Sequence, residues 1–142
     1  MIVNVILAIL VLSVIIIVHE FGHFIVAKAN GVTVLEFALG FGPKLIHFKK
    51  GETVYSIKLL PFGGSCMMLG DEFMEAQTDE DEDEQADEKD GKAKTLEEEY
   101  DADRAFSNKS VWSRIAIIAA GPLFNFLLAL ILSIIMIGVD GY

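Results

Sequence analysis

The sequence predicts a membrane α-helical fold with a small β-region. We expect two transmembrane helices joined by a cytoplasmic loop, which contains a membrane-associated antiparallel β-sheet and a disordered acidic tract. Hydrophobic residues make up 53% of the 142 residues, although the formal net charge is −10. Two apolar runs are each long enough to cross a bilayer, and most acidic residues lie in one stretch between them. The chain therefore divides into four parts, residues 1–29, 30–70, 71–105 and 106–140.

The first part is predicted to be a retained transmembrane helix. Residues 2 to 18 are apolar apart from Asn4 and Ser13. At about 1.5 Å per residue, a helix that ends near Ala29 could reach roughly 40 Å. A cleaved signal peptide is the alternative, but no basic region precedes the apolar run and no small-residue cleavage site follows it. We therefore expect this helix to stay in the membrane.

The second part, residues 30–70, has the pattern of a small sheet. The segment TVYSIKL alternates and is rich in β-branched and aromatic residues, which favours a strand. The letters KKGE before it indicate the tight turn of a hairpin, and glycines and prolines mark further turns. We expect about four short antiparallel strands. The region is apolar for a loop, so one face should pack on the helices or dip into the membrane.

The third part is strongly acidic. Residues 71 to 103 hold seventeen Asp and Glu against three Lys. Such a segment has little apolar surface to bury, so we expect part 71–105 to be a solvated, disordered loop. Cys66 is the only cysteine, which excludes an internal disulfide and a cysteine zinc cluster.

The fourth part, 106–140, contains the second apolar run, from about Val111 to Val139. Pro122 should kink this helix, because proline lacks an N–H and clashes with the preceding turn. All eleven Lys and Arg lie between Lys28 and Arg114. The positive-inside rule therefore places the connecting loop in the cytoplasm and both termini outside. This predicts a multi-pass membrane protein.

Three ionisable residues, His19, Glu20 and His23, lie inside the first apolar run, where such side chains are costly. Histidines four residues apart share one face of a helix. In the HExxH pattern the two histidines bind Zn²⁺, and the glutamate is the general base. The alternative is that these are ordinary packed helix residues, but a chance HExxH inside a membrane helix is improbable. We expect Gly22 to leave room for a substrate backbone.

Asn125 is a polar amide among apolar residues of the second run. Hydrogen bonding between helices is its ordinary role in membranes. However, counting along two antiparallel helices at about 1.5 Å per residue brings it close to the level of His19. A role near the metal is therefore expected as well. His47 is a lone histidine in a predicted strand, and we interpret it as structural or exposed.

Four blocks together resemble a known family. They are HEFGHFIVAKANGV, FALGFGPKL, LLPFGGSCMML and AFSNKSVWSRIAIIAAGPLFNFLLA. In this order they resemble the N-terminal half of a site-2 protease, of the bacterial regulator-of-sigma-E or RIP metalloprotease type. The resemblance implies an intramembrane zinc metalloendopeptidase of the bacterial inner membrane that carries out regulated intramembrane proteolysis. Its substrates would be transmembrane-helix proteins, such as anti-sigma factors or signal-peptide remnants, and no nucleic acid is expected as a partner.

The resemblance also implies roles for individual residues. His19 and His23 would be the metal ligands and Glu20 the catalytic residue. The β-region would receive an unwound substrate strand by strand addition. Three residues would contribute to substrate binding, namely Asn125, Gly63 and Gly64.

One departure from the family concerns the third ligand. A catalytic zinc site of this kind takes three protein ligands and a water. The resemblance implies an Asp in a Leu-Asp-Gly motif on a later helix, which this sequence lacks, and Asp140 would lie too far from His19. We therefore expect the chain alone to be inactive and incomplete as an enzyme. One alternative is an inactive short membrane protein that binds transmembrane helices or regulates a full-length relative. Another is a different membrane zinc hydrolase, such as a prenyl-protein protease.

Overall fold

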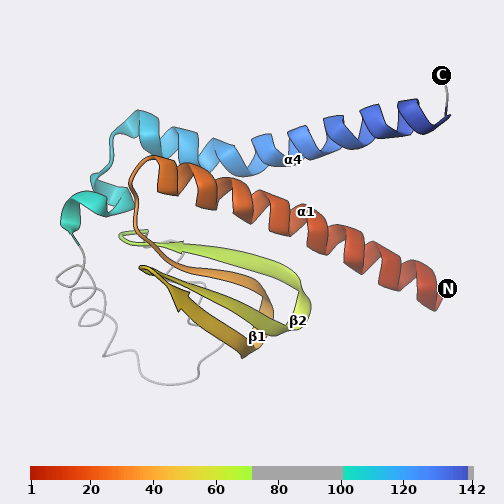
Figure 1. The fold of residues 1–142 in the computed structure, drawn as a ribbon, viewed down its shortest axis with the longest axis horizontal. Coiled ribbons are helices and arrows are strands. Elements are labelled where there is room, and N and C mark those ends of the chain that lie inside the picture. The colour runs from red at the N-terminus through yellow and green to blue at the C-terminus, as the bar shows by residue number, and fades with distance from the viewer. Residues whose placement is uncertain (72–100, 141–142) are drawn as a thin grey trace.

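The computed structural model describes residues 1–71 and 101–140. In the described ranges two long helices accompany one two-stranded antiparallel sheet. In Figure 1, α1 lies between α4 and the sheet, and the marked N- and C-terminal ends lie at the same end of the molecule. The elements are α1 (Ile2–Ala29), β1 (Val34–Lys50), β2 (Thr53–Met68), the short 3-10 helices η2 (Ala102–Arg104) and η3 (Phe106–Asn108), and α4 (Val111–Asp140).

The two predicted helices are confirmed. Both are long and apolar enough to cross a membrane, and most of their large apolar side chains are exposed on the surface of the molecule. A lipid environment would cover such side chains, whereas water would leave them exposed. α4 continues through Pro122, and its axis changes direction along the ribbon in Figure 1. α1 ends where Gly31 takes a positive φ of 69°.

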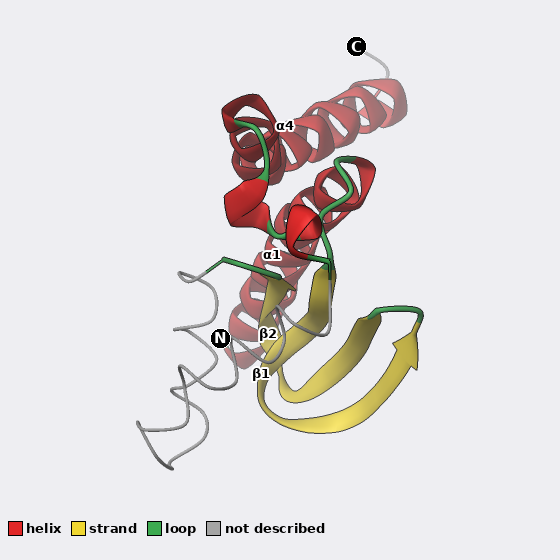
Figure 2. Ribbon diagram, turned by 90° about the vertical axis from the view of Figure 1, so that its left-hand side faces the viewer, coloured by secondary structure: helices red, strands yellow, loops and turns green. Residues whose placement is uncertain are grey.

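The predicted small antiparallel sheet is also confirmed, with two long strands in place of about four short ones. β1 has 17 residues and β2 has 16. Both strands curve strongly (Figure 2), and Glu36 pairs with both Val54 and Met67. Gly40 and Gly42 have φ values of 89° and 86°. These conformations, which L-residues avoid, bend β1 while the ladder continues.

The core lies where α1, α4 and the sheet meet. Phe24 of α1 packs against two sheet residues, with ring centroids 5.1 Å from Phe37 and 6.0 Å from Tyr55. This packing holds the sheet against the second half of α1. The buried cluster consists of Ala27, Val32, Val34, Phe37, Cys66, Met68 and Ile117.

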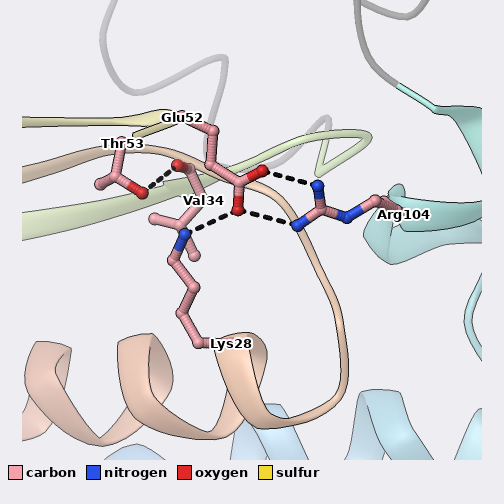
Figure 3. A network of polar contacts seen from close by, with 5 residues as sticks. All are labelled: Lys28, Val34, Glu52, Thr53 and Arg104. Atoms are coloured by element: carbon pink, nitrogen blue, oxygen red, sulfur yellow. Dashed lines mark hydrogen bonds and ion pairs between the residues drawn. The ribbon is translucent and has the colours of Figure 1, made fainter. Parts of the chain in front are cut away.

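A polar cluster joins the end of α1, the hairpin turn and η2 (Figure 3). Glu52 Oε1 accepts from Lys28 Nζ at 2.7 Å, and Arg104 forms ion pairs with both carboxylate oxygens, at 2.8 and 2.7 Å. Burial raises the pKa of Glu52, but these hydrogen bonds and positive charges outweigh burial and lower it below its ordinary value of 4.5. The cluster therefore ties the described chain after residue 100 to the sheet and α1. The predicted acidic tract itself lies mainly outside the described residues.

Candidate metal centre

The two predicted metal ligands lie on the face of α1 that packs against α4. Their ring centroids are 4.8 Å apart. A Cβ placed at Gly121 of α4 would lie 2.6 Å from His19 Nε2 and 2.5 Å from His23 Nε2. The two Nε2 atoms therefore converge on the space that the missing side chain of Gly121 leaves.

The other ring nitrogens contact α4. His23 Nδ1 lies 2.7 Å from the carbonyl oxygen of Ile117. A carbonyl only accepts, so Nδ1–H is the donor and the Nε2 lone pair of His23 remains available. His19 Nδ1 lies 3.2 Å from the side-chain amide of Asn125. The structure thus brings Asn125 to the histidines, as the depth estimate predicted.

Glu20 faces the sheet beside the histidines. One carboxylate oxygen accepts a hydrogen bond from the backbone N–H of Cys66 in β2. The other, Oε2, is buried and has no hydrogen-bond partner among the described residues. The structure therefore fixes the carboxylate through one oxygen and leaves the other available.

These residues fit a zinc ion. Two imidazole nitrogens converge on one space, the usual zinc–nitrogen distance is about 2.0–2.1 Å, and a carboxylate oxygen without a partner lies on the residue next to His19. Within residues 1–71 and 101–140, no group of three or more His, Cys, Asp or Glu could hold a metal ion. Asp140 lies roughly 28 Å along α4 from Gly121, at about 1.5 Å per residue. The described residues therefore bring together two candidate protein ligands, His19 and His23.

The two glycines predicted to bind substrate lie in different surroundings. A Cβ at Gly64 would lie 3.4 Å from Glu20 Cγ, so β2 passes directly beside the carboxylate. A Cβ at Gly63 would collide with the ring of Phe41. Gly63 therefore packs on an aromatic ring of β1, and Gly64 is the one that borders the site.

The expectation for Gly22 is wrong. A Cβ there would lie 2.6 Å from the carbonyl oxygen of Ala120. Gly22 is buried and allows close contact between α1 and α4, so it is not positioned to admit a substrate backbone. His47 is exposed in β1, away from the other two histidines, which agrees with its interpretation as a residue outside the site.

Sequence reasoning missed three contributors to the site: Gly121, the Ile117 carbonyl and the Cys66 N–H. Backbone groups leave no mark on a residue pattern. Gly121 did leave one, because glycine inside a helix is costly and often marks a close approach.

Convergent imidazoles beside an available carboxylate are typical of zinc-hydrolase sites, and here they lie on a helix long and apolar enough to cross a membrane. The chain belongs to peptidase family M50, whose family model matches residues 7–142. The resemblance to the site-2 protease family is thereby confirmed.

Several bacterial relatives carry zinc metalloprotease names. A presumed zinc metalloprotease of Clostridium acetobutylicum is 43% identical over 129 residues, covering 91% of this chain and 31% of the relative. One of Clostridium perfringens is 42% identical over 130 residues, covering 92% and 31%. The zinc metalloprotease RasP of Bacillus licheniformis is 49% identical over 69 residues, covering 49% and 16%. The chain thus spans 31% of the length of the two Clostridium relatives.

Proposed function

We propose that the chain forms the active-site part of an intramembrane zinc metalloendopeptidase of the site-2 type. Its substrates would be single-pass membrane proteins, such as anti-sigma factors or signal-peptide remnants, cleaved within their transmembrane helices. One observation carries the proposal. His19 Nε2 and His23 Nε2 converge beside Gly121, and the buried Glu20 Oε2 next to them has no hydrogen-bond partner in the part of the chain that the structure describes. A carboxylate and two imidazoles inside a lipid-facing helix are costly unless they act.

The chemistry divides between the metal and Glu20. His19 and His23 would hold the zinc ion, and the chemistry that it would supply there is polarisation of the scissile carbonyl and a lower pKa of water. Glu20 Oε2 takes the proton of the attacking water and passes it to the leaving amide nitrogen. The Cys66 N–H holds the other oxygen of Glu20 during both transfers. Its strand therefore keeps the base in place.

The third metal ligand would come from the complete protein. A catalytic zinc site takes three protein ligands, and the two candidates that lie together among the described residues are His19 and His23. The chain covers 31% of the length of its Clostridium relatives, and the family resemblance implies an Asp on a later helix. We therefore assign the activity to the complete protein and expect the chain alone to be inactive.

The last half of β2 is the proposed site of substrate presentation. Residues 64 to 68 of β2 pair with β1 on one side, and Cys66 directs its N–H toward Glu20 on the other. A helical substrate hides its peptide bonds, whereas an unwound segment added along this strand would expose them to the base. Gly64 borders this path, with Gly63 beside it and Asn125 across on α4.

The proposed location is the bacterial inner membrane, with the loop between the helices in the cytoplasm and both termini outside. The distribution of Lys and Arg supports this orientation. In Figure 1 the chain enters α1 and leaves α4 at the same end of the molecule, which supports placing both termini on one side of the membrane.

The test is Glu20→Gln in the complete protein, assayed in membranes against a single-pass substrate. We expect cleavage to be lost while zinc content stays that of the native protein, because Gln keeps the shape and loses the base. Asp103→Asn is the matched control, since Asp103 is an exposed carboxylate in η2, outside the site. Undiminished cleavage by Glu20→Gln would refute the mechanism. A native protein that binds no zinc would instead favour the inactive, helix-binding alternative.

A further inference from the structure

Three residues of α4 face the histidines at intervals of one turn. The Ile117 carbonyl contacts His23 Nδ1, Gly121 leaves the space on which both Nε2 atoms converge, and the Asn125 amide contacts His19 Nδ1. Residues four apart lie on one face of a helix. α4 is antiparallel to α1, so the order 117, 121, 125 runs against the order 23, 19. One face of α4 therefore contacts Nδ1 of both imidazoles and borders the space on which their Nε2 atoms converge.

An imidazole that binds a metal through Nε2 must carry its proton on Nδ1, and that N–H needs an acceptor. The Ile117 carbonyl is such an acceptor for His23. At His19 the group within hydrogen-bond distance of Nδ1 is the Asn125 amide. Which end of an amide is oxygen follows from the hydrogen-bond network, since a half-turn about the last side-chain bond exchanges Oδ1 and Nδ2.

Asn125 Oδ1 is buried and has no hydrogen-bond partner among residues 1–71 and 101–140 when Nδ2 faces His19. The half-turn places Oδ1 against Nδ1 of His19. It satisfies the buried oxygen and gives the imidazole the acceptor that an Nδ1–H needs. A buried acceptor without a partner is destabilising, so the turned amide is favoured whenever His19 carries its proton on Nδ1.

We propose that Asn125 is a positioning residue for the metal ligand His19. Its Oδ1 accepts the Nδ1–H of His19, fixes this tautomer and directs the Nε2 lone pair toward the space beside Gly121. This inference rests on the proposed function, because His19 is a metal ligand only if the site binds zinc. It differs from the substrate-binding role that the family resemblance implies for Asn125, because the contact is to a ligand of the metal.

The first test reads the tautomer without any metal or substrate. ¹⁵N NMR of the histidine-labelled, metal-free complete protein in detergent reports which ring nitrogen carries the proton, at a pH where the rings are neutral, and the signal of His19 is the one lost in His19→Gln. We expect His19 to carry its proton on Nδ1 in the native protein and in Asn125→Asp, which keeps an acceptor. In Asn125→Leu, an Nε2–H population should appear at His19. His47, exposed in β1, should be unchanged and serves as the internal reference.

The second test measures zinc affinity of the complete protein by chelator competition. Removing an outer partner of a metal ligand typically costs about 10–100-fold in affinity, and we expect that loss for Asn125→Leu and its recovery in Asn125→Asp. Ser133→Ala is the matched control, because it removes an exposed polar group of α4 that bonds its own helix.

The outcomes separate the inference from the proposed function. An Nε2–H tautomer of His19 in the native protein would overturn the inference. An unchanged tautomer and affinity in Asn125→Leu, with a raised KM, would also overturn it and favour substrate binding. In both cases a native protein that binds zinc leaves the proposed function standing. A native protein without zinc affinity would instead defeat the function, while the tautomer of His19 would still decide the inference.

Discussion

Replacing Gly121 with alanine adds one methyl group at the point where the two metal ligands meet. That carbon would lie 2.5 Å from His23 Nε2, 2.6 Å from His19 Nε2 and 2.7 Å from His19 Cε1. Carbon and nitrogen atoms in contact normally stay well over 3 Å apart, so both imidazoles must move. We expect zinc affinity to fall by at least about 100-fold, the upper end of the range for losing an outer partner, because here the ligands themselves are displaced.

The assay is zinc content and chelator competition on the purified complete protein. Gly138→Ala is a matched control on the same helix, because a Cβ at Gly138 meets nothing within 4 Å. Alanine is the better helix former by about 1 kcal/mol, so neither variant should weaken α4 itself. Native zinc affinity in Gly121→Ala would refute the convergence of the two histidines on this space. An equal loss of zinc affinity in Gly121→Ala and Gly138→Ala would show that the effect is not specific to the position of Gly121.

The remaining predictions concern the packing around the site. The pKa of Glu52 is lower in the folded protein than its ordinary value of 4.5, so ionised Glu52 stabilises the fold at pH values above 4.5. This stabilisation is lost as the pH falls through the lower, folded-state pKa. When the pH is lowered below about 4.5, the thermal unfolding midpoint of the native protein should decrease. If the midpoint of Glu52→Gln decreased as steeply with pH, this prediction would be contradicted. Gly22→Ala should lower stability by about 1–3 kcal/mol, measured by thermal unfolding, because its Cβ would lie 2.6 Å from the Ala120 carbonyl oxygen; an unchanged midpoint would show that the helices separate at no cost. Burial, with Glu20 and Asp71 nearby, raises the pKa of the Cys66 thiol to about 12, so iodoacetamide at pH 8 should alkylate only unfolded protein, and rapid labelling of the folded state would argue against this burial.

Features with a local periodic pattern were predictable from the sequence. The two helices follow from long apolar runs, and the shared face of His19 and His23 follows from their spacing of four. Alternation predicted strands but could not give their lengths. Gly40 bends β1 without ending it, and the same residue in a sequence is equally a sign of a turn.

Features that depend on contacts between distant segments were not predictable in the same way. His23 meets the carbonyl of Ile117, 94 residues away, and His19 meets Asn125, 106 residues away. Gly22 faces α4 because of the way the helices cross, which its position between two site residues does not reveal. The depth estimate for Asn125 succeeded because rise per residue and antiparallel packing are enough to fix a level in a membrane.

The site is divided among three elements that lipid alone would not hold together. Apolar helices gain little from burying one another in a bilayer, so close contacts of small residues and polar pairs must supply the association. Gly22 and Gly121 let α1 and α4 approach, and the cluster at Glu52 fixes the sheet at the polar end of α1. Under the proposed function, α1 would carry the metal ligands His19 and His23, α4 would orient their rings, and β2 would hold the base Glu20. Loss of packing between α1 and α4 should therefore reduce metal binding. Loss of packing between α1 and β2 should instead reduce proton transfer.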